Sequence, residues 1–163
     1  MKALRSRWID GQEWALDGLT RLARRRPGYE AQPEHLRTGL DGERAAYFYL
    51  RRQGYTVVAR RWSTGEVPGD IDLIAWLGAL LCIVEVKTRT AHDMAAAEVA
   101  VDDHKRRTLR RLARHYLRQL PQPEAPSVRF DVLSVYLLPG RKREFVHFEG
   151  AFGWGEENRD ERY

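Results

Sequence analysis

Apolar and polar residues alternate with two different periods along this chain, and the period predicts where helices and strands lie. Ala46, Tyr47 and Leu50 recur at helical spacing, which predicts a helix of about 13 residues ending at Gly54, a favoured residue after a helix. Residues 102–120 give the clearest helical pattern, with leucines on one side and arginines on the other. Five short apolar segments predict strands, and they span residues 56–62, 70–76, 80–88, 128–138 and 144–149.

The order of these elements predicts the fold class and the domain boundaries. A helix, three strands, a second helix and two strands indicate an α/β fold, with a mixed β-sheet flanked by helices. The pattern covers residues 38–153, which we expect to form the compact domain. Residues 1–37 lie before it as a basic N-terminal extension, partly helical or disordered, and residues 154–163 follow it as a C-terminal tail.

The extension carries a weaker helical pattern. Residues 13–26 predict a short helix, and residues 24–37 combine arginine, proline and glycine as linkers do. The three arginines at residues 24–26 either contact phosphate or belong to a solvated tail. The expected helix places its apolar residues loosely on one side, and they are Trp14, Leu19, Leu22 and Ala23.

Composition narrows the choice of partner. The 163 residues carry a net charge of +5 with a pI of about 9.6, which favours an acidic partner, nucleic acid before an anionic membrane. A basic protein without an acidic partner is the open alternative. No apolar stretch reaches the roughly 18 residues of a membrane-spanning helix, so we expect a cytoplasmic protein. The lone Cys82 excludes an intramolecular disulfide and a multi-cysteine zinc site.

Residues 69–90 place charged side chains among apolar ones. If residues 70–88 form a hairpin that turns at residues 78–79, Asp72 lies opposite Glu85 and Asp70 lies opposite Lys87, all on one face. Two adjacent carboxylates repel each other unless a cation lies between them. Carboxylate oxygens suit Mg²⁺, or Mn²⁺ in its place. The alternative is a polar strand end, with Asp70 and Lys87 as an exposed ion pair.

Lys87 stands out because only four of the 28 basic residues are lysines. An ammonium at this position can stabilise the charge that develops on a phosphate during cleavage. Glu43 heads the core-facing side of the first domain helix, where it either joins the acidic site or complements the helix dipole. The basic face of helix 102–120 either contacts phosphates or is a solvated surface, and the candidates are Lys105, Arg106, Arg107, Arg110, Arg111 and Arg114.

The pattern D-x(12)-E-x-K with an upstream helical glutamate resembles the PD-(D/E)XK nuclease superfamily. Six segments resemble, in order, the YraN-like family of bacterial predicted endonucleases, which is related to archaeal Holliday junction resolvases. The resemblance implies a restriction-endonuclease-like fold, with Asp72 and Glu85 as metal ligands, Lys87 as the catalytic lysine and Glu43 as a further acid at the metal. Asp70 stands where the family has a glutamate. The six segments are GLDGERAAYFYLRRQGYTVVARRW, GDIDLIA, IVEVKTR, KRRTLRRLARHYL, RFDVLSV and HFEGAF.

Three functions follow from these observations. The first is a Mg²⁺-dependent DNA endonuclease that hydrolyses phosphodiester bonds, with branched or otherwise structured DNA as its candidate substrate. The second is a non-catalytic nucleic-acid-binding module with the same fold, and the third is a scaffold that binds an acidic partner. By analogy with resolvases, which cut two strands symmetrically, a homodimer is the expected assembly. We expect a structural role for Asp131, and surface or structural positions rather than metal-ligand roles for His104 and His147.

Overall fold

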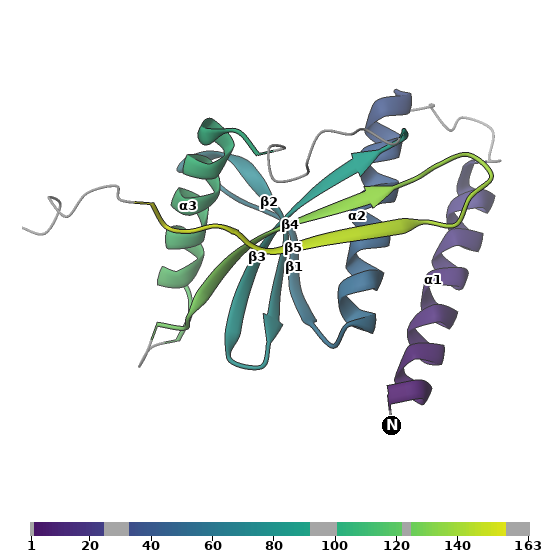
Figure 1. Cartoon of the computed structure of the whole chain (residues 1–163), viewed down its shortest axis with the longest axis horizontal. Helices are drawn as coiled ribbons and strands as arrows, with labels where there is room; N and C mark the ends of the chain where they lie inside the picture. Colours follow the sequence, from purple (N-terminus) through teal and green to yellow (C-terminus); the bar gives the residue numbers. More distant parts are fainter. Residues whose placement is uncertain (1, 25–32, 92–100, 122–124, 156–163) are drawn as a thin grey trace, which may run out of the picture.

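The computed structural model describes residues 2–24, 33–91, 101–121 and 125–155, and shows an α/β fold within these ranges. The sheet is mixed and helices flank it, as the sequence predicts (Figure 1). Its elements are α1 (Lys2–Arg24), α2 (Glu34–Arg52), β1 (Thr56–Thr64), β2 (Val67–Leu77), β3 (Leu80–Arg89), α3 (Asp103–Arg118), β4 (Val128–Tyr136) and β5 (Glu144–Phe152).

The five strands lie in the sheet in the same order as in the chain. All neighbouring pairs are antiparallel except β3 and β4, which are parallel and are connected through α3. All five predicted strands are confirmed. Strands β1 and β2 extend further toward each other than the predicted strands 56–62 and 70–76, because Thr64 pairs with Val67 and leaves a two-residue turn between them.

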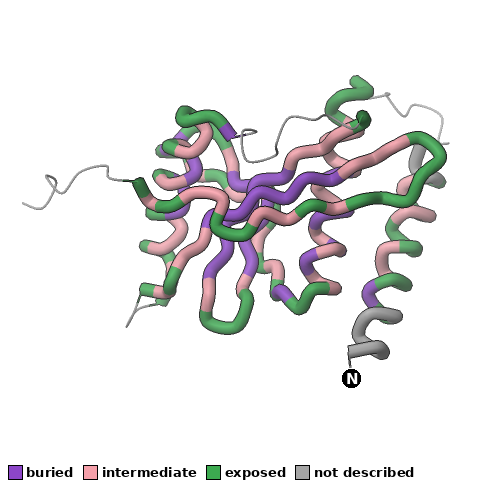
Figure 2. The backbone as a smooth tube through the Cα atoms, in the orientation of Figure 1, coloured by how far each residue is buried: buried purple, intermediate pink, exposed green. Residues whose placement is uncertain are grey.

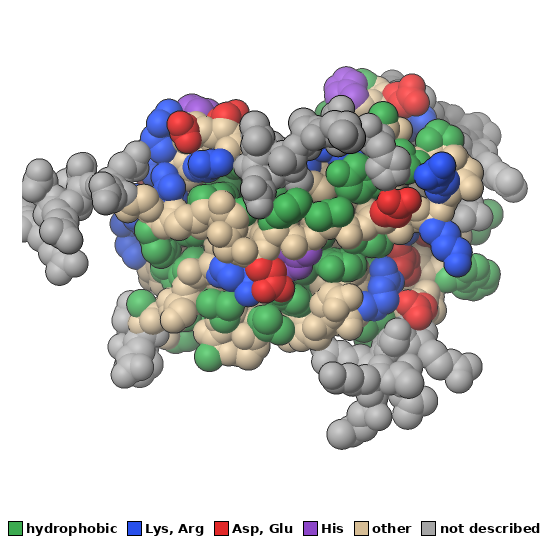
Figure 3. Space-filling view, in the orientation of Figure 1, with side chains coloured by type: hydrophobic (Ala, Val, Ile, Leu, Met, Phe, Trp, Pro, Cys, Tyr) green, Lys and Arg blue, Asp and Glu red, His purple; other side chains and the backbone are tan. Residues whose placement is uncertain are grey.

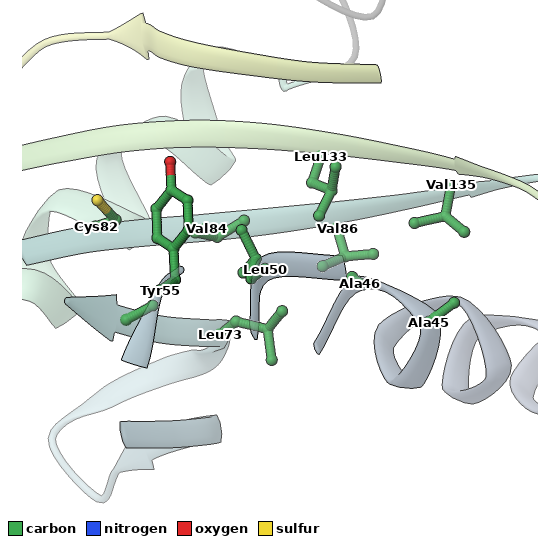
Figure 4. Packing of buried hydrophobic residues seen from close by; sticks show 11 residues of the cluster. Ala45, Ala46, Leu50, Tyr55, Leu73, Cys82, Val84, Val86, Leu133 and Val135 are labelled. Atoms are coloured by element: carbon green, nitrogen blue, oxygen red, sulfur yellow. The ribbon is translucent and has the colours of Figure 1, made fainter. Parts of the chain in front are cut away.

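Two apolar cores lie on opposite faces of the sheet. On one face, Ala46 and Leu50 of α2 pack against side chains that include Leu73, Val84 and Leu133 (Figure 4). On the other face, residues of α3 pack against a second set of strand side chains. The central strands are therefore buried on both sides, as Figure 2 shows. The second core includes Leu109, Leu112, Ile74, Ile83 and Phe130.

Gly42 lets α2 approach β3 closely. A Cβ atom at Gly42 would overlap the Thr88 side chain, with only 2.8 Å to its Cβ and Cγ2 atoms. This is closer than real Cβ contacts come, so the helix and strand meet here only because residue 42 is glycine. The contact brings the next residue, Glu43, close to the end of β3.

Gly42→Ala is expected to destabilise the protein by about 1–3 kcal/mol, because the added methyl group overpacks this contact. Gly39→Ala in the same helix is the matched control, since nothing lies within 4 Å of a Cβ there. It should stabilise by up to about 1 kcal/mol through helix propensity alone. Urea unfolding of both variants measures the difference. If Thr88→Ala fails to rescue Gly42→Ala, the overlap is not the cause.

The N-terminal part is more helical than the sequence pattern predicts. Helix α2 begins at Glu34, so residues 34–37 belong to a helix and not to the expected linker. Helix α1 has 23 residues and lies on the outer side of α2 (Figure 1). Neither α1 nor any other helix in the described part of the chain is long and apolar enough to cross a membrane. The arginines at positions 25 and 26 lie outside the described residues.

The apolar residues expected on one side of the N-terminal helix are largely exposed on α1. Trp14, Leu19 and Leu22 are 81%, 63% and 62% exposed, and no side chain of Ala23 is described. Among the described side chains of α1, Ile9 is the one buried apolar residue. Helix α1 contacts α2 through its acidic side, whose ion pairs are described below.

Candidate functional site

The acidic residues predicted from the hairpin lie where strands β2 and β3 separate. The predicted register is confirmed from the turn to Leu73, which pairs with Val84. Beyond this pair a side chain replaces the backbone as hydrogen-bond partner. The Oδ2 atom of Asp72 accepts a 2.6 Å hydrogen bond from the backbone N–H of Val86. The predicted cross-strand pairing of Asp72 with Glu85, and of Asp70 with Lys87, is therefore wrong in its detail, since the ladder ends before these positions.

Two lysines hold the carboxylate of Glu85. Lys87 Nζ donates to Oε1 at 2.8 Å, and Lys105 Nζ lies 3.1 Å from Oε2. The Glu85 side chain is only 5% exposed, so its charge needs such partners. Lys105 also donates to the backbone carbonyl of Asp70 at 3.3 Å. Residues of β2, β3 and α3 thus meet at one point.

Lys105 belongs to this acidic site and not to the outer basic face of α3, where the sequence analysis placed it. The signal for this role was present in the chain. Lys105 is the one lysine among the arginines of α3, and the scarcity that singled out Lys87 applies to it equally. A lysine presents a compact charge to a single carboxylate oxygen.

Glu43 approaches the site from α2, beside an arginine that sequence reasoning missed. Arg61 Nε lies 3.9 Å from Glu43 Oε2 and 3.7 Å from Asp70 Oδ2. Arg61 has a φ of 47°, the one positive φ of a non-glycine residue in the described chain. That conformation is uncommon for a long side chain and persists where the surroundings require it. Nothing in the sequence distinguishes Arg61 from Arg60.

Burial and mutual repulsion change the proton affinities of the site acids. Burial, and next the charge of Glu85, raise the pKa of Asp72 to about 7. Burial also raises the pKa of Glu43, with Asp70 and Glu85 adding to the shift. For Lys105, burial alone would lower the pKa, but the charges of Glu85 and Asp72 outweigh it and raise the pKa. The lysines therefore do not fully neutralise the acids.

Asp72→Asn is expected to raise the melting temperature at pH 8 in EDTA and to lose this advantage toward pH 4. The pKa of Asp72 is about 7 in the folded protein against an ordinary 3.8. Between these values the folded state binds more protons than the unfolded state, so wild-type stability falls as pH rises. The amide stays neutral and can still accept the Val86 N–H, which gives a gain on the order of 2 kcal/mol. Thermal unfolding at several pH values measures it, and a variant that melts lower at pH 8 would contradict the repulsion.

The site opens to two hollows that share Glu43. The larger has a volume of about 670 Å³ and lies between the start of α2 and the end of β3. The smaller, of about 220 Å³, reaches Arg61. Both provide space for a ligand next to the acids. The larger is lined by Glu34, His35, Thr38, Gly39, Glu43, Val86, Thr88 and Thr90.

The donor set fits a hard divalent cation. Glu43 Oε2 and Glu85 Oε2 are buried without a hydrogen-bond partner, and Lys105 contacts the second of these as an ion pair only. Carboxylate oxygens of this kind suit Mg²⁺ or Mn²⁺. Across the described residues, no three acidic, histidine or cysteine side chains converge as a ready metal-binding group. The assignment of Asp72, Glu85 and Glu43 as metal ligands stays a prediction.

The predicted basic face of α3 is divided in the structure. The guanidinium groups of Arg106 and Arg110 each lie 5.7 Å from the centre of the Phe152 ring, and Arg110 Nε donates to the Gly153 carbonyl at 2.8 Å. Arg114 lies 5.6 Å from the ring of Trp154. The C-terminal residues thus cover part of this face. The arginines on its exposed stripe are Arg107, Arg111, Arg114 and Arg118.

Asp131 has the structural role that the sequence suggests. It is fully buried and accepts hydrogen bonds from Arg129 at 2.8 and 2.9 Å, and from the backbone N–H of Gly150 at 2.9 Å. His147 Nε2 lies 3.1 Å from its Oδ2. Burial by itself would raise the pKa of Asp131, but these partners lower it below its usual range. His104 is exposed on α3.

Comparison with known proteins identifies the family. A family model described as "Uncharacterised protein family UPF0102" matches residues 42–135, more than half of the chain. The chain belongs to the UPF0102 family. A UPF0102 protein of Koribacter versatilis is 56% identical over 121 residues, which are 74% of this chain and 82% of that protein. One from Solibacter usitatus is 46% identical over 132 residues, 81% and 92% of the two chains. One from Porphyromonas gingivalis is 41% identical over 120 residues, 73% and 86% of the chains.

Membership in UPF0102 agrees with the YraN-like resemblance of the ordered sequence segments. The UPF0102 match begins on α2, at the glycine that allows close contact with β3, and ends in β4. Helix α1 lies outside it. The span contains every candidate site residue named so far, namely Glu43, Arg61, Asp70, Asp72, Glu85, Lys87 and Lys105.

Proposed function

We propose that this protein is a Mg²⁺-dependent endonuclease of the PD-(D/E)XK type that hydrolyses phosphodiester bonds in DNA. The observation that carries the proposal is the site at the open end of the β2–β3 hairpin. There, buried carboxylates that repel one another lie beside two lysines and a cleft of about 670 Å³. An apolar core gains nothing from such a cluster, because each buried charge costs free energy. A bound divalent cation would offset the repulsion between the carboxylates, and a phosphate could then bind to the cation and the lysines.

The residues divide into ligands and positioning groups. Glu43, Asp72 and Glu85 would hold the ion, with Asp72 already oriented by its bond from the Val86 N–H. When bound, Mg²⁺ polarises a phosphate oxygen and lowers the pKa of a bound water. Lys87 would stabilise the negative charge that develops on the reacting phosphate. Lys105 offsets the charge of Glu85 and ties α3 to β2.

The direct test is incubation of the wild-type protein with four DNA substrates in Mn²⁺, in Mg²⁺ or in EDTA. The substrates are a four-way junction, a flap, a single strand and a plain duplex of equal length. We expect cleavage with either metal and none in EDTA, with junction or flap cut faster than duplex. Binding of all four without cleavage in either metal would favour the non-catalytic module.

The position of each arginine along α3 predicts how much it contributes to DNA binding. Arg107 and Arg118 are both exposed on the same stripe, about 200–220° around the helix from Lys105. Along the helix axis, however, Arg107 is about 3 Å and Arg118 about 20 Å from Lys105. Arg107 is therefore the closer of the two to the level of the site along the helix axis.

Arg107→Gln is expected to lower the log–log salt slope of duplex binding by about 0.9, the value for one lost phosphate contact. Arg118→Gln is the matched control and should leave the slope unchanged. Fluorescence anisotropy in EDTA at several salt concentrations measures both. Equal and substantial effects of the two changes would mean that DNA lies along the whole stripe. No effect of either would favour an acidic protein partner for this face.

A further inference from the structure

Helix α1 is attached through its acidic residues. Its three acids, Asp10, Glu13 and Asp17, are spaced three and four residues apart and therefore lie on one side of the helix. Each of them forms an ion pair with an arginine of α2 or of the segment between β4 and β5. Side chains of both charges lie next to one another where this segment reaches α1 (Figures 1 and 3).

The contacts are close and partly buried. Asp17 Oδ1 lies 2.9 Å from Arg44, and Glu13 Oε2 lies 2.7 Å from Arg52. Arg143 pairs with both acids, at 3.3 Å from Asp17. The two carboxylates are only 18% and 14% exposed. Each carboxylate therefore contacts two arginines, as a phosphate group does in a basic site.

The arginines that hold α1 form a continuous surface beside the candidate site. This α2 arginine surface consists of Arg44, Arg51, Arg52 and Arg143. Arg51 belongs to it through a 2.7 Å hydrogen bond from its Nη1 to Gln12 Oε1. Arg44 directly follows Glu43 in α2, and Arg51 lies about two turns further along the same side of the helix. Arg44 also pairs with Asp41 of its own helix, at 3.2 Å.

The contacts of helix α1 with α2 suit a helix that can be displaced from the rest of the protein. Of the side chains described in α1, Ile9 is the one apolar residue buried in the attachment, whereas Trp8, Trp14 and Leu19 are 61%, 81% and 63% exposed. Ion pairs that stay partly open to solvent are screened by salt, which weakens an attachment made mainly of such pairs. The UPF0102 match starts only at residue 42.

We propose that the α2 arginine surface binds the phosphate backbone of nucleic acid, and that α1 is a built-in cover that nucleic acid displaces. The acidic side of α1 takes the place of a row of phosphates. The choice of nucleic acid as the polyanion rests on the proposed function. The surface continues from Glu43 along α2, so a strand bound at the candidate cleft would meet these arginines next.

The first test weakens the cover and measures binding. Glu13→Gln/Asp17→Asn should tighten binding of a labelled 20-base-pair duplex in EDTA about tenfold, the factor expected if wild type is open in about one molecule in ten. It should also steepen the salt slope, because newly available arginines release more counterions. Adding Arg52→Gln/Arg143→Gln should abolish the gain.

The control variant is Glu66→Gln/Asp103→Asn, which changes the net charge equally. Both residues are exposed and pair elsewhere, with His115 and Arg106. We expect it to change affinity less than twofold. An equal gain in the control, or no gain in Glu13→Gln/Asp17→Asn, would overturn the proposal, because the effect would then come from overall charge or α1 would not compete.

The second test observes α1 directly, by hydrogen exchange of the wild-type protein in EDTA. Saturating duplex should speed amide exchange in α1 and leave exchange in α3 unchanged or slower. Bound duplex with unaltered exchange in α1 would overturn the proposal. So would a polyglutamate peptide that releases α1 better than duplex at equal charge, since the surface would then recognise an acidic protein. Neither test requires cleavage, so an inactive protein with a displaceable α1 would refute only the proposed endonuclease.

Discussion

Lys87→Ala is expected to lower the rate of DNA cleavage in Mg²⁺ by about 10²–10³-fold while the protein stays folded. Lys87 contacts Glu85 Oε1, but Lys105 contacts the other oxygen of the same carboxylate. Glu85 therefore keeps one cationic partner in the variant, and its burial stays compensated. The lost ammonium is the one that we expect to act on the reacting phosphate. Single-turnover cleavage of the best substrate, with enzyme in excess, measures this step separately from binding.

Two comparisons identify what a loss would mean. Lys142→Ala removes an exposed lysine outside the site and should cleave like wild type. Thermal unfolding of Lys87→Ala with and without Mg²⁺ should show the same shift by the ion as in wild type, because the carboxylates are unchanged. If Lys87→Ala abolishes this shift as well, Lys87 positions the ligands and does not act on phosphate. If cleavage persists, the catalytic assignment is wrong.

Asp131→Asn is expected to destabilise the protein by about 3–5 kcal/mol, because the amide removes the buried charge that pairs with Arg129 and puts an NH2 group where a carboxylate oxygen accepts hydrogen bonds. Arg129 and His147 both contact this fully buried carboxylate, and the Gly150 N–H donates to it. In a domain of this size the loss corresponds to a fall in melting temperature on the order of 10 °C. Differential scanning calorimetry at pH 7 measures it.

The same substitution at Asp72 should have the opposite sign at pH 8, which makes the two variants controls for each other. The pKa of Asp131 is lowered by its partners, so its contribution to stability is present at neutral pH and is lost in acid. The pKa of Asp72 is raised, so its charge destabilises the fold above pH 7. Two variants that change stability in the same direction at pH 8 would contradict this contrast.

The β2–β3 hairpin was largely predictable from sequence because its register depends on local features. Apolar runs on either side of Gly78, which has a φ of 61°, leave one pairing that keeps both cores intact. The same reasoning wrongly extended the backbone pairing of the two strands beyond Leu73 to Asp72 and Asp70. A side chain that bonds to backbone, as Asp72 does with Val86, ends a ladder without any change in the apolar pattern.

Contacts between distant segments were not predictable in the same way. In the sequence, Arg106 and Arg110 do not differ from the other arginines of α3. In the fold they are distinguished by their contacts with Phe152 and with the residue after it. Helix α1 shows the same limit. The ion pairs that attach it depend in part on Arg143, 126 residues beyond Asp17.

The single parallel pair, β3 with β4, determines the order in which this chain can fold. Strands β1 to β3 pair through short turns, and so do β4 and β5, so each group can form from contacts that are near in sequence. Joining the two groups requires closure of the long connection that contains α3, which is the slower event for entropic reasons. Glu85 and Lys87 share the first group, whereas Lys105 arrives with the connection. Asp72 and Glu85 are thus brought together before Lys105 arrives, and closure of the chain is also the step that brings this second positive charge to Glu85.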